Sequence, residues 1–182
     1  MKKALTLLIC LLSCTMSWAQ DVKEPDFAFE PYVYYENNGE LGHALPVEEA
    51  YSKAKVGASV FLVGVGKVKT YYYVKGVNSK LRISLPGNSI VINTGNQSPM
   101  QTLSINKFEE QGKTRRFQIG EAGTFTGAKT ETEGSQQLRY KKHGQNSVII
   151  SLDDLEPGEY CITITNQMTN SKSAKVYTFA IE

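Results

Sequence analysis

Four carboxylate side chains crowd a short segment near the end of the chain: Asp153, Asp154, Glu156 and Glu159. Paired carboxylates can act as acid and base in glycan hydrolysis, and carboxylates on a loop can bind Ca²⁺. Their spacing matches no calcium-binding repeat, so we expect a solvated acidic turn without a metal ion. A hydrolase of envelope polymers that uses these acids is the enzyme class that the sequence leaves open.

The segment around Gly64, Gly66 and Lys67 resembles a phosphate-binding loop at first sight. That loop needs a glycine where this chain has Phe61, and a Ser or Thr where it has Val68. Two glycines in a strand more often mark a bulge or a close approach of two backbones. We therefore expect no bound nucleotide and no other cofactor.

Few other groups could support nucleophilic catalysis. The chain has two histidines, His43 in the first hairpin and His143 in a basic turn where solvation is expected, and no Gly-x-Ser-x-Gly motif. Cys161 lies in an apolar alternating run without a histidine neighbour, so we expect a buried thiol. These observations favour a protein that is not an enzyme.

Tyrosines gather in two segments, residues 32–35 and 71–73. Alternation along a strand places Tyr72 on one face and Tyr71 and Tyr73 on the other. Packing within a sheet explains such residues, and so does a platform on which sugars or partner proteins stack. We expect any ligand site on an exposed tyrosine face. The residues predicted to form it are Tyr34, Tyr35, Tyr71 and Tyr73.

The segment Leu155-Glu156-Pro157-Gly158-Glu159-Tyr160 describes a turn and the strand that follows it. Pro157 presets φ and Gly158 tolerates a positive φ. A tyrosine at the start of a strand can return its hydroxyl to the upstream backbone, an arrangement called a tyrosine corner. We expect a buried Tyr160 bonded to the backbone near Leu155 or Asp154, at the corner of a β-sandwich.

Period-two alternation dominates the chain, and the charge pattern of Val47–Val56 breaks the only helical periodicity of that length. Strands are expected at residues 26–35, 41–46, 58–65, 67–74, 80–85, 90–94, 101–108, 114–119, 123–126, 137–140, 146–152, 160–165 and 176–181. Turn signals separate them at short intervals, which is typical of a sandwich. We predict an all-β, immunoglobulin-like β-sandwich in which the last three segments are strands E, F and G.

The expected organisation is a signal peptide at residues 1–19, an N-terminal hairpin region at 20–59 and a sandwich domain at 60–182. The hairpin either packs on the sandwich or extends an edge of the same sheet. A single core is expected between the sheets. Its predicted members are Leu103, Ile105, Phe117, Ile119, Val148, Ile150, Leu152, Leu155, Tyr160, Ile162 and Ile164.

The N-terminus predicts export. A basic start precedes an apolar stretch at residues 4–12 that is too short to span a bilayer, and Ser17-Trp18-Ala19 has small residues where a signal peptidase requires them. Cleavage between Ala19 and Gln20 is favoured. Lipidation at Cys14, which would anchor the protein to a membrane, stays open because Leu11-Leu12-Ser13-Cys14 resembles a lipobox.

Charge excludes one class of partner. Removal of residues 1–19 takes away two lysines and leaves eighteen basic and eighteen acidic residues, a formal net charge of zero. A neutral chain lacks the basic excess that nucleic acids attract, so we expect no nucleic-acid partner.

The order of several motifs between residues 60 and 182 resembles a group of exported Bacteroidetes β-sandwich proteins of unassigned function. The motifs are Lys75-Gly76 with Ser79, Leu81-Arg82-Ile83, Asn106-Lys107-Phe108 with Arg115-Arg116, Tyr140-Lys141-Lys142-His143-Gly144, the turn before Tyr160, and Val176-Tyr177-Thr178-Phe179-Ala180-Ile181. Members of that group commonly end in a Phe-Gly-Ile/Val-Asp-like segment, where this chain has Phe179-Ala180-Ile181-Glu182. The resemblance implies a sandwich fold and an exported location, and it supplies no catalytic residue or substrate.

We therefore expect a non-enzymatic binding or interaction module of the bacterial periplasm, the outer membrane surface or the medium. A protein or a glycan of the cell envelope is the expected partner. Two alternatives are a glycan hydrolase and a pilus or adhesin subunit, of which the second requires an open sheet edge or a donor strand.

Overall fold

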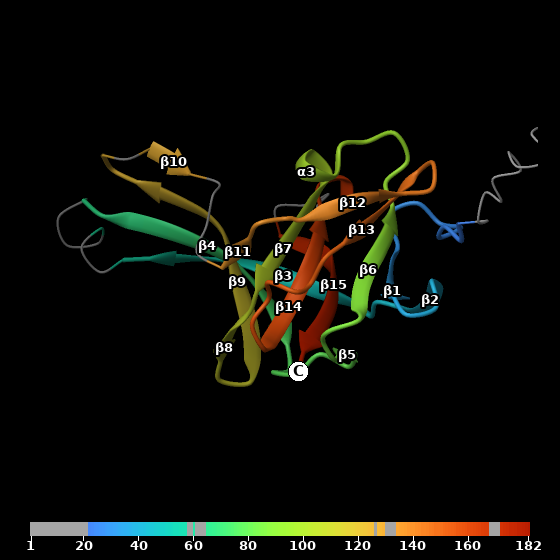
Figure 1. Cartoon of the computed structure of the whole chain (residues 1–182). Helices are drawn as coiled ribbons and strands as arrows, with labels where there is room; N and C mark the ends of the chain where they lie inside the picture. Colours follow the sequence, from blue (N-terminus) through green and yellow to red (C-terminus); the bar gives the residue numbers. More distant parts are fainter. Residues whose placement is uncertain (1–21, 58–59, 61–64, 126, 130–133, 168–171) are drawn as a thin grey trace, which may run out of the picture.

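The computed structural model describes residues 22–57, 60, 65–125, 127–129, 134–167 and 172–182. Its regular structure is nearly all β-strand, as predicted, in two sheets that pack as a curled sandwich (Figure 1). The smaller sheet contains, in order, β12 (Tyr140–His143), β13 (Ser147–Ile150), β6 (Asn88–Asn93), β1 (Pro31–Tyr35) and β2 (Glu40–Ala44). The sequence segments expected to form a signal peptide or a lipid anchor lie outside the described residues.

The larger sheet contains, in order, β10 (Gly127–Lys129), β9 (Thr114–Gly123), β4 (Lys67–Lys75), β3 (Val47–Val56), β15 (Ser173–Ile181), β14 (Gly158–Ile164), β7 (Leu103–Lys107) and β11 (Ser135–Gln136). Two short strands complete it, β5 (Arg82–Ile83) beside β15 and β8 (Glu109–Gln111) beside β9. One helical turn, α3 (Pro99–Thr102), precedes β7, and a 3-10 turn, η2 (Thr165–Gln167), follows β14.

The expected strands E, F and G correspond to β13, β14 and β15. β14 pairs with β15 on one side and β7 on the other, while β13 pairs with β6 in the smaller sheet. Strands F and G of an immunoglobulin domain are likewise neighbours, and strand E lies in the opposite sheet. This placement supports the immunoglobulin-like assignment, which stays a prediction beyond the all-β sandwich.

The N-terminal hairpin is part of the smaller sheet. β1 pairs with β2 and with β6, and β2 is the outermost strand on that side. β3 lies inside the larger sheet between β15 and β4. Of the two hairpin placements that the sequence allows, the extension of a sheet is therefore the one observed, and strands before residue 60 contribute to both sheets.

The tyrosine corner is present. Tyr160 is 1% exposed and its hydroxyl donates a 2.8 Å hydrogen bond to the backbone carbonyl of Glu156, one residue beyond the expected stretch. Its ring stacks on Phe179 with ring centroids 5.6 Å apart. The Leu155 amide bonds back to the Leu152 carbonyl, so the turn closes on itself before the strand starts. Sequence reasoning was therefore correct about this element.

Two apolar clusters form instead of the single core that we expected. The first lies between the two sheets and contains most of the predicted residues, including Leu103, Ile150 and Ile162. Phe117 belongs to the second cluster, on the opposite face of the larger sheet, and Ile119 packs against it. The prediction of one core was wrong because alternation along β9 shows which side chains share a face, and not which layer covers that face.

The second cluster exists because the larger sheet curls. Only Phe108 separates β7, which pairs with β14, from β8, which pairs with β9. The chain thus crosses at Phe108 from one part of the sheet to a distant part, and the Phe108 and Phe117 rings meet edge to face at 5.7 Å. Sheets with many strands twist and coil in this way.

A charged residue lies in this second core. Arg115 is 1% exposed, and its guanidinium donates to the Glu48 carboxylate and to the backbone carbonyls of Lys75 and Gly76. The guanidinium carbon also lies 4.8 Å from the centroid of the Phe108 ring. Burial of an unpaired charge is costly, so these partners are needed to stabilise the buried guanidinium of Arg115.

Some expected strands differ in position. The strand expected at residues 137–140 is replaced by β11 just before it and β12 from Tyr140 onward, and residues 99–102 form α3 before β7 begins. The strand expected at 58–65 falls largely on residues outside the described part. The separate strand expected at 123–126 is wrong, because Gly123 ends β9 and residues 124–125 form a turn. Within the described part, no helix has the length and apolar character needed to cross a membrane.

Candidate ligand-binding face

The larger sheet has one face that the smaller sheet covers only in part. On β14 and β15 this front face carries Tyr160, Ile162 and Phe179, which pack in the first core. Strand pairing shows which residues of the neighbouring strands lie on the same face. Tyr177 of β15 pairs with Val47 of β3, Tyr51 of β3 pairs with Tyr73 of β4, and Tyr73 pairs with Arg116 of β9. Figure 1 shows β3, β4 and β9 extending away from the smaller sheet, so the strands of that sheet do not cover this part of the front face.

We call this region the uncovered front face and define it by the alternating side chains of four strands. They are Glu49, Tyr51, Lys53 and Lys55 of β3, Lys67, Lys69, Tyr71, Tyr73 and Lys75 of β4, Arg116, Gln118 and Glu121 of β9, and Glu109 of β8.

Tyr71, Tyr73 and Arg116 form one cluster on this face. The two rings meet edge to face with centroids 6.3 Å apart, and the Arg116 guanidinium carbon lies 4.3 Å from the Tyr71 centroid. Arg116 Nη1 donates to the Tyr73 hydroxyl at 3.3 Å, and Nε and Nη2 donate to Glu109 Oε2 at 3.1 and 3.0 Å. The hydrogen bond with Tyr73 is the main cause that raises the pKa of Arg116, and Glu109 adds to it.

Lysines surround the cluster. The Lys53 ammonium lies 5.3 Å from the centroid of the Tyr73 ring. Lys67 and Lys69 both approach the carboxylate of Glu121, at 2.6 and 3.7 Å. This part of the face therefore presents amine and guanidinium groups held by aromatic rings and carboxylates.

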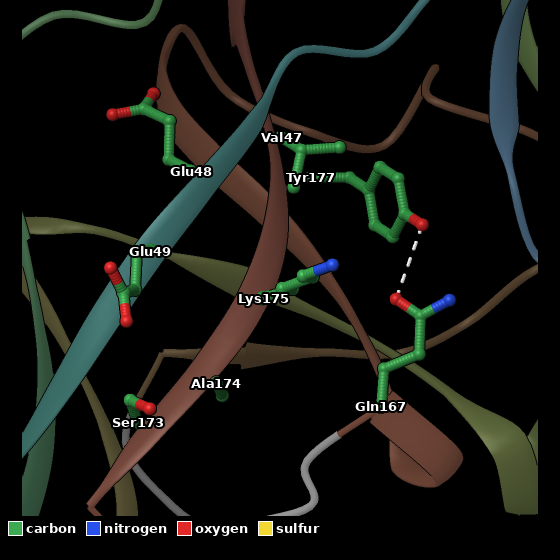
Figure 2. Close-up of a pocket in the computed structure, with 8 residues that line it drawn as sticks. All are labelled: Val47, Glu48, Glu49, Gln167, Ser173, Ala174, Lys175 and Tyr177. Atoms are coloured by element: carbon green, nitrogen blue, oxygen red, sulfur yellow. Dashed lines mark hydrogen bonds between the residues drawn. The ribbon is translucent and has the colours of Figure 1, made fainter.

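An open groove of about 770 Å³ continues the face toward the body of the sandwich (Figure 2). Its lining comes from β3, β15 and η2: Val47, Glu48, Glu49, Gln167, Ser173, Ala174, Lys175 and Tyr177. The Tyr177 hydroxyl lies 3.1 Å from Gln167 Oε1, and Tyr51, next to the groove, donates to Glu49 at 2.6 Å. The bond to Glu49 raises the pKa of the Tyr51 phenol.

The structure brings together only half of the predicted tyrosine set. Tyr71 and Tyr73 share a face, as alternation predicts, and Tyr72 packs on the other face in the second core. Tyr34 and Tyr35 lie on β1 in the smaller sheet, on the opposite side of the molecule in Figure 1. A single face built from both pairs is therefore not assembled.

Tyr34 and Tyr35 have local partners of their own. The Tyr34 ring meets His143 edge to face at 5.0 Å, and Tyr35 lies over Gly42, where a Cβ would come within 2.8 Å of the ring. His143 is half-buried, and its Nε2 lies 3.1 Å from the Lys23 carbonyl oxygen, so it is not the fully solvated residue that we expected.

A carboxylate clamp holds the N-terminal segment beside this pair. Glu24 accepts hydrogen bonds from the Gln145 amide at 2.6 Å, the Asn146 amide at 2.9 Å and the Ser147 hydroxyl at 2.7 Å. Partial burial opposes ionisation, but these three bonds outweigh it and lower the pKa of Glu24. The clamp ties the chain start to the β12–β13 turn.

The four carboxylates of the acidic segment have separate partners. Asp153 accepts from Ser151 at 2.9 Å, and Asp154 pairs with Arg139 at 2.7 Å. Glu156 pairs with Lys107 at 3.0 Å, while Glu159 accepts from the Ser79 amide at 2.6 Å and from Arg82 at 3.3 Å. Within the described residues, no group of three or more His, Cys, Asp or Glu side chains is placed to hold a metal ion.

Cys161 is fully buried in the second core, as the sequence predicts. Burial raises the pKa of its thiol well above the usual range. A thiol in this setting stays protonated at neutral pH and is a poor nucleophile.

Sequence reasoning missed Arg116 and the lysines as members of a site. The available signal was the alternation of Lys67, Lys69, Tyr71 and Tyr73 along one strand, which places all four on one face. Arg116 could not be found this way, because its place beside Tyr73 depends on the pairing of β9 with β4.

No family model matches the chain, and no curated protein matches it.

Proposed function

We propose that this protein is an exported, non-enzymatic β-sandwich module that binds a component of the bacterial cell envelope through its uncovered front face. The observation that carries the proposal is the cluster of Arg116, Tyr71 and Tyr73 with its surrounding lysines, on a part of the sheet face that the smaller sheet does not cover in the described part of the chain. Polar and aromatic groups fixed in this way on a rigid sheet suit recognition.

Export is part of the proposal and rests on the N-terminal sequence and on the resemblance to exported Bacteroidetes proteins. Cleavage after Ala19 would release the module into the periplasm or the medium, and lipidation at Cys14 would anchor it to a membrane. Mass spectrometry of the protein isolated from its host separates the two, because a diacylated Cys14 and an unmodified or cyclised Gln20 differ in mass. An N-terminus that retains Met1 would contradict export.

The binding test uses the chain from Gln20 onward, mixed with purified envelope fractions: peptidoglycan, outer membranes and extracted polysaccharide. We expect cosedimentation or retention with at least one fraction and no release of soluble fragments from it. A protein that stays entirely unbound contradicts the proposed function. Release of sugar fragments that Glu156→Gln or Glu159→Gln abolishes would favour the hydrolase instead.

One observation favours a second candidate, a subunit that assembles by strand addition. β2 is the outermost strand of the smaller sheet in the described part of the chain, so one side of its backbone is open to another strand. Sedimentation velocity over a range of protein concentrations tests this directly. Polymers that grow with concentration support assembly through the edge, and a monomer throughout argues against it.

A further inference from the structure

The tyrosines of the uncovered front face do not offer free rings for stacking. Tyr71 is only 5% exposed, and among the described residues Arg116 lies over its ring and Tyr73 meets its edge. Lys53 lies over Tyr73 in the same way. Each ring thus supports a cation, and a ligand that approaches the face meets the cation first.

The charge of the face follows from this arrangement. Its described side chains carry six cationic groups, Lys53, Lys55, Lys67, Lys69, Lys75 and Arg116, against the three carboxylates Glu49, Glu109 and Glu121. The formal excess is three positive charges on a chain that would be neutral after removal of residues 1–19. Lys53 and Lys55 have no ion-pair partner among the described residues, so they are available to an anionic ligand.

The shape of the face suits a chain molecule. Successive residues on one side of a strand lie about 6.5 Å apart and neighbouring strands about 4.8 Å apart, so the cations form rows and not a single pocket. The face continues into the open groove, where Ser173, Lys175 and Gln167 add polar groups beside the carboxylates of Glu48 and Glu49. Repeating anionic groups joined by hydroxyl-bearing units match such a surface.

We propose that the uncovered front face binds an acidic polysaccharide, with Lys53, Lys55 and Arg116 contacting its anionic groups. This inference rests on the proposed function and names its ligand class. Tyr71 and Tyr73 are positioning residues that hold Arg116 and Lys53 in place. The ammonium and guanidinium groups donate charge-assisted hydrogen bonds to carboxylates or sulfates, which are stronger than bonds to neutral sugars.

The experiment measures affinity by isothermal titration with polygalacturonate, which carries a carboxylate on every sugar, and with neutral dextran as the uncharged control. The test variant is Lys53→Gln/Lys55→Gln. The matched control is Lys141→Gln/Lys142→Gln on β12, which removes two exposed lysines from the other sheet. Both variants change the net charge equally and leave every ion pair described here intact.

We expect polygalacturonate to bind and dextran not to bind. The Lys53→Gln/Lys55→Gln protein should bind about tenfold more weakly or worse, because two charged hydrogen-bond donors are lost. The control should stay close to the unmodified protein, and added salt should weaken binding. Tyr73→Phe removes the hydroxyl that orients Arg116 and should weaken binding without changing the net charge.

Several results would overturn the inference. Equal weakening by the two lysine variants would mean unspecific charge attraction, and equal binding of dextran would mean that anionic groups are not recognised. Binding to phosphatidylglycerol vesicles or to duplex DNA in preference to polygalacturonate would assign the face to a lipid or a nucleic acid. If envelope fractions retain the protein and the Lys53→Gln/Lys55→Gln variant equally, this inference fails while the proposed function stands. If the unmodified protein binds neither polygalacturonate nor any envelope fraction, both this inference and the proposed function fail.

Discussion

The buried Arg115–Glu48 pair allows the most demanding test of the fold. Replacement of Arg115 by Met keeps an apolar stem in the second core but removes the guanidinium. Among the described residues, Glu48 then keeps only the hydrogen bond from the Thr178 hydroxyl, at 2.6 Å, and the carbonyls of Lys75 and Gly76 lose their side-chain donor. Because Arg115 is 1% exposed, the space that its guanidinium leaves is not open to solvent.

The magnitude follows from the environment of the pair. Removal of one partner of a buried ion pair costs about 3–5 kcal/mol, since the other charge is left uncompensated. The Glu48 side chain is 21% exposed, so solvent can partly stabilise its carboxylate. We therefore expect Arg115→Met to lower the free energy of unfolding by about 3 kcal/mol, the lower end of that range.

The matched control is Arg139→Met, which breaks the pair with Asp154. Those side chains are 62% and 56% exposed, and pairs in such settings contribute at most about 1 kcal/mol. The only tryptophan, Trp18, lies in the predicted signal peptide, so unfolding in urea is best followed by circular dichroism. A loss for Arg115→Met no larger than that for Arg139→Met would refute the buried pair.

A double-mutant cycle completes this test. Glu48→Gln leaves the Arg115 charge without its counterion, and the Glu48→Gln/Arg115→Met protein removes both charges. We expect the double variant to lose less stability than the two single variants together, with a coupling of about 1–3 kcal/mol. Additive losses would show that the two side chains do not interact in solution.

Three further predictions concern other elements. Tyr160→Phe should lower the unfolding free energy by about 1 kcal/mol, because the hydrogen bond to the Glu156 carbonyl is lost; an unchanged thermal midpoint would contradict the tyrosine corner. Since the pKa of Glu24 is lowered in the folded state, its contribution to stability is present above the unfolded value of about 4.3 and is lost as the pH falls through the folded pKa. Glu24→Gln should remove that part of the acid dependence, and identical pH profiles of the two proteins would show that the clamp does not form. Cys161 should resist a thiol reagent such as dithiobis-nitrobenzoate in the native protein and react in urea, so rapid native labelling would contradict its burial.

Local patterns predicted the elements whose causes are local. The Pro157-Gly158 turn and Tyr160 lie within a few residues of each other, so their geometry depends little on the rest of the chain. Alternation likewise separated Tyr72 from Tyr71 and Tyr73 correctly. Where several weak strand signals lie close together, as at residues 135–143, position depends on the partner strand, and the expected strand was misplaced.

The candidate site likewise has features that local sequence patterns predict and features that depend on strand pairing. We predicted from the sequence that Tyr34 and Tyr35 share one face with Tyr71 and Tyr73. The prediction was open to this error because the sequence of a strand does not show which sheet the strand joins. The pairing of β1 with β6 and of β4 with β9 separates the two pairs. The same pairing brings Arg116 over Tyr71 and converts an expected aromatic surface into a cationic one.

By itself, the sequence determined the all-β class, the tyrosine corner, the order of the last three strands and the burial of Cys161, because short-range periodicity and turn chemistry suffice for these features. Only the tertiary structure decided that the larger sheet curls, that Phe117 packs in a second core around Arg115, and that the smaller sheet leaves part of the front face uncovered. These features come from contacts between segments far apart in the chain. Alternation shows which side chains share a face, and only the folded chain shows what covers that face.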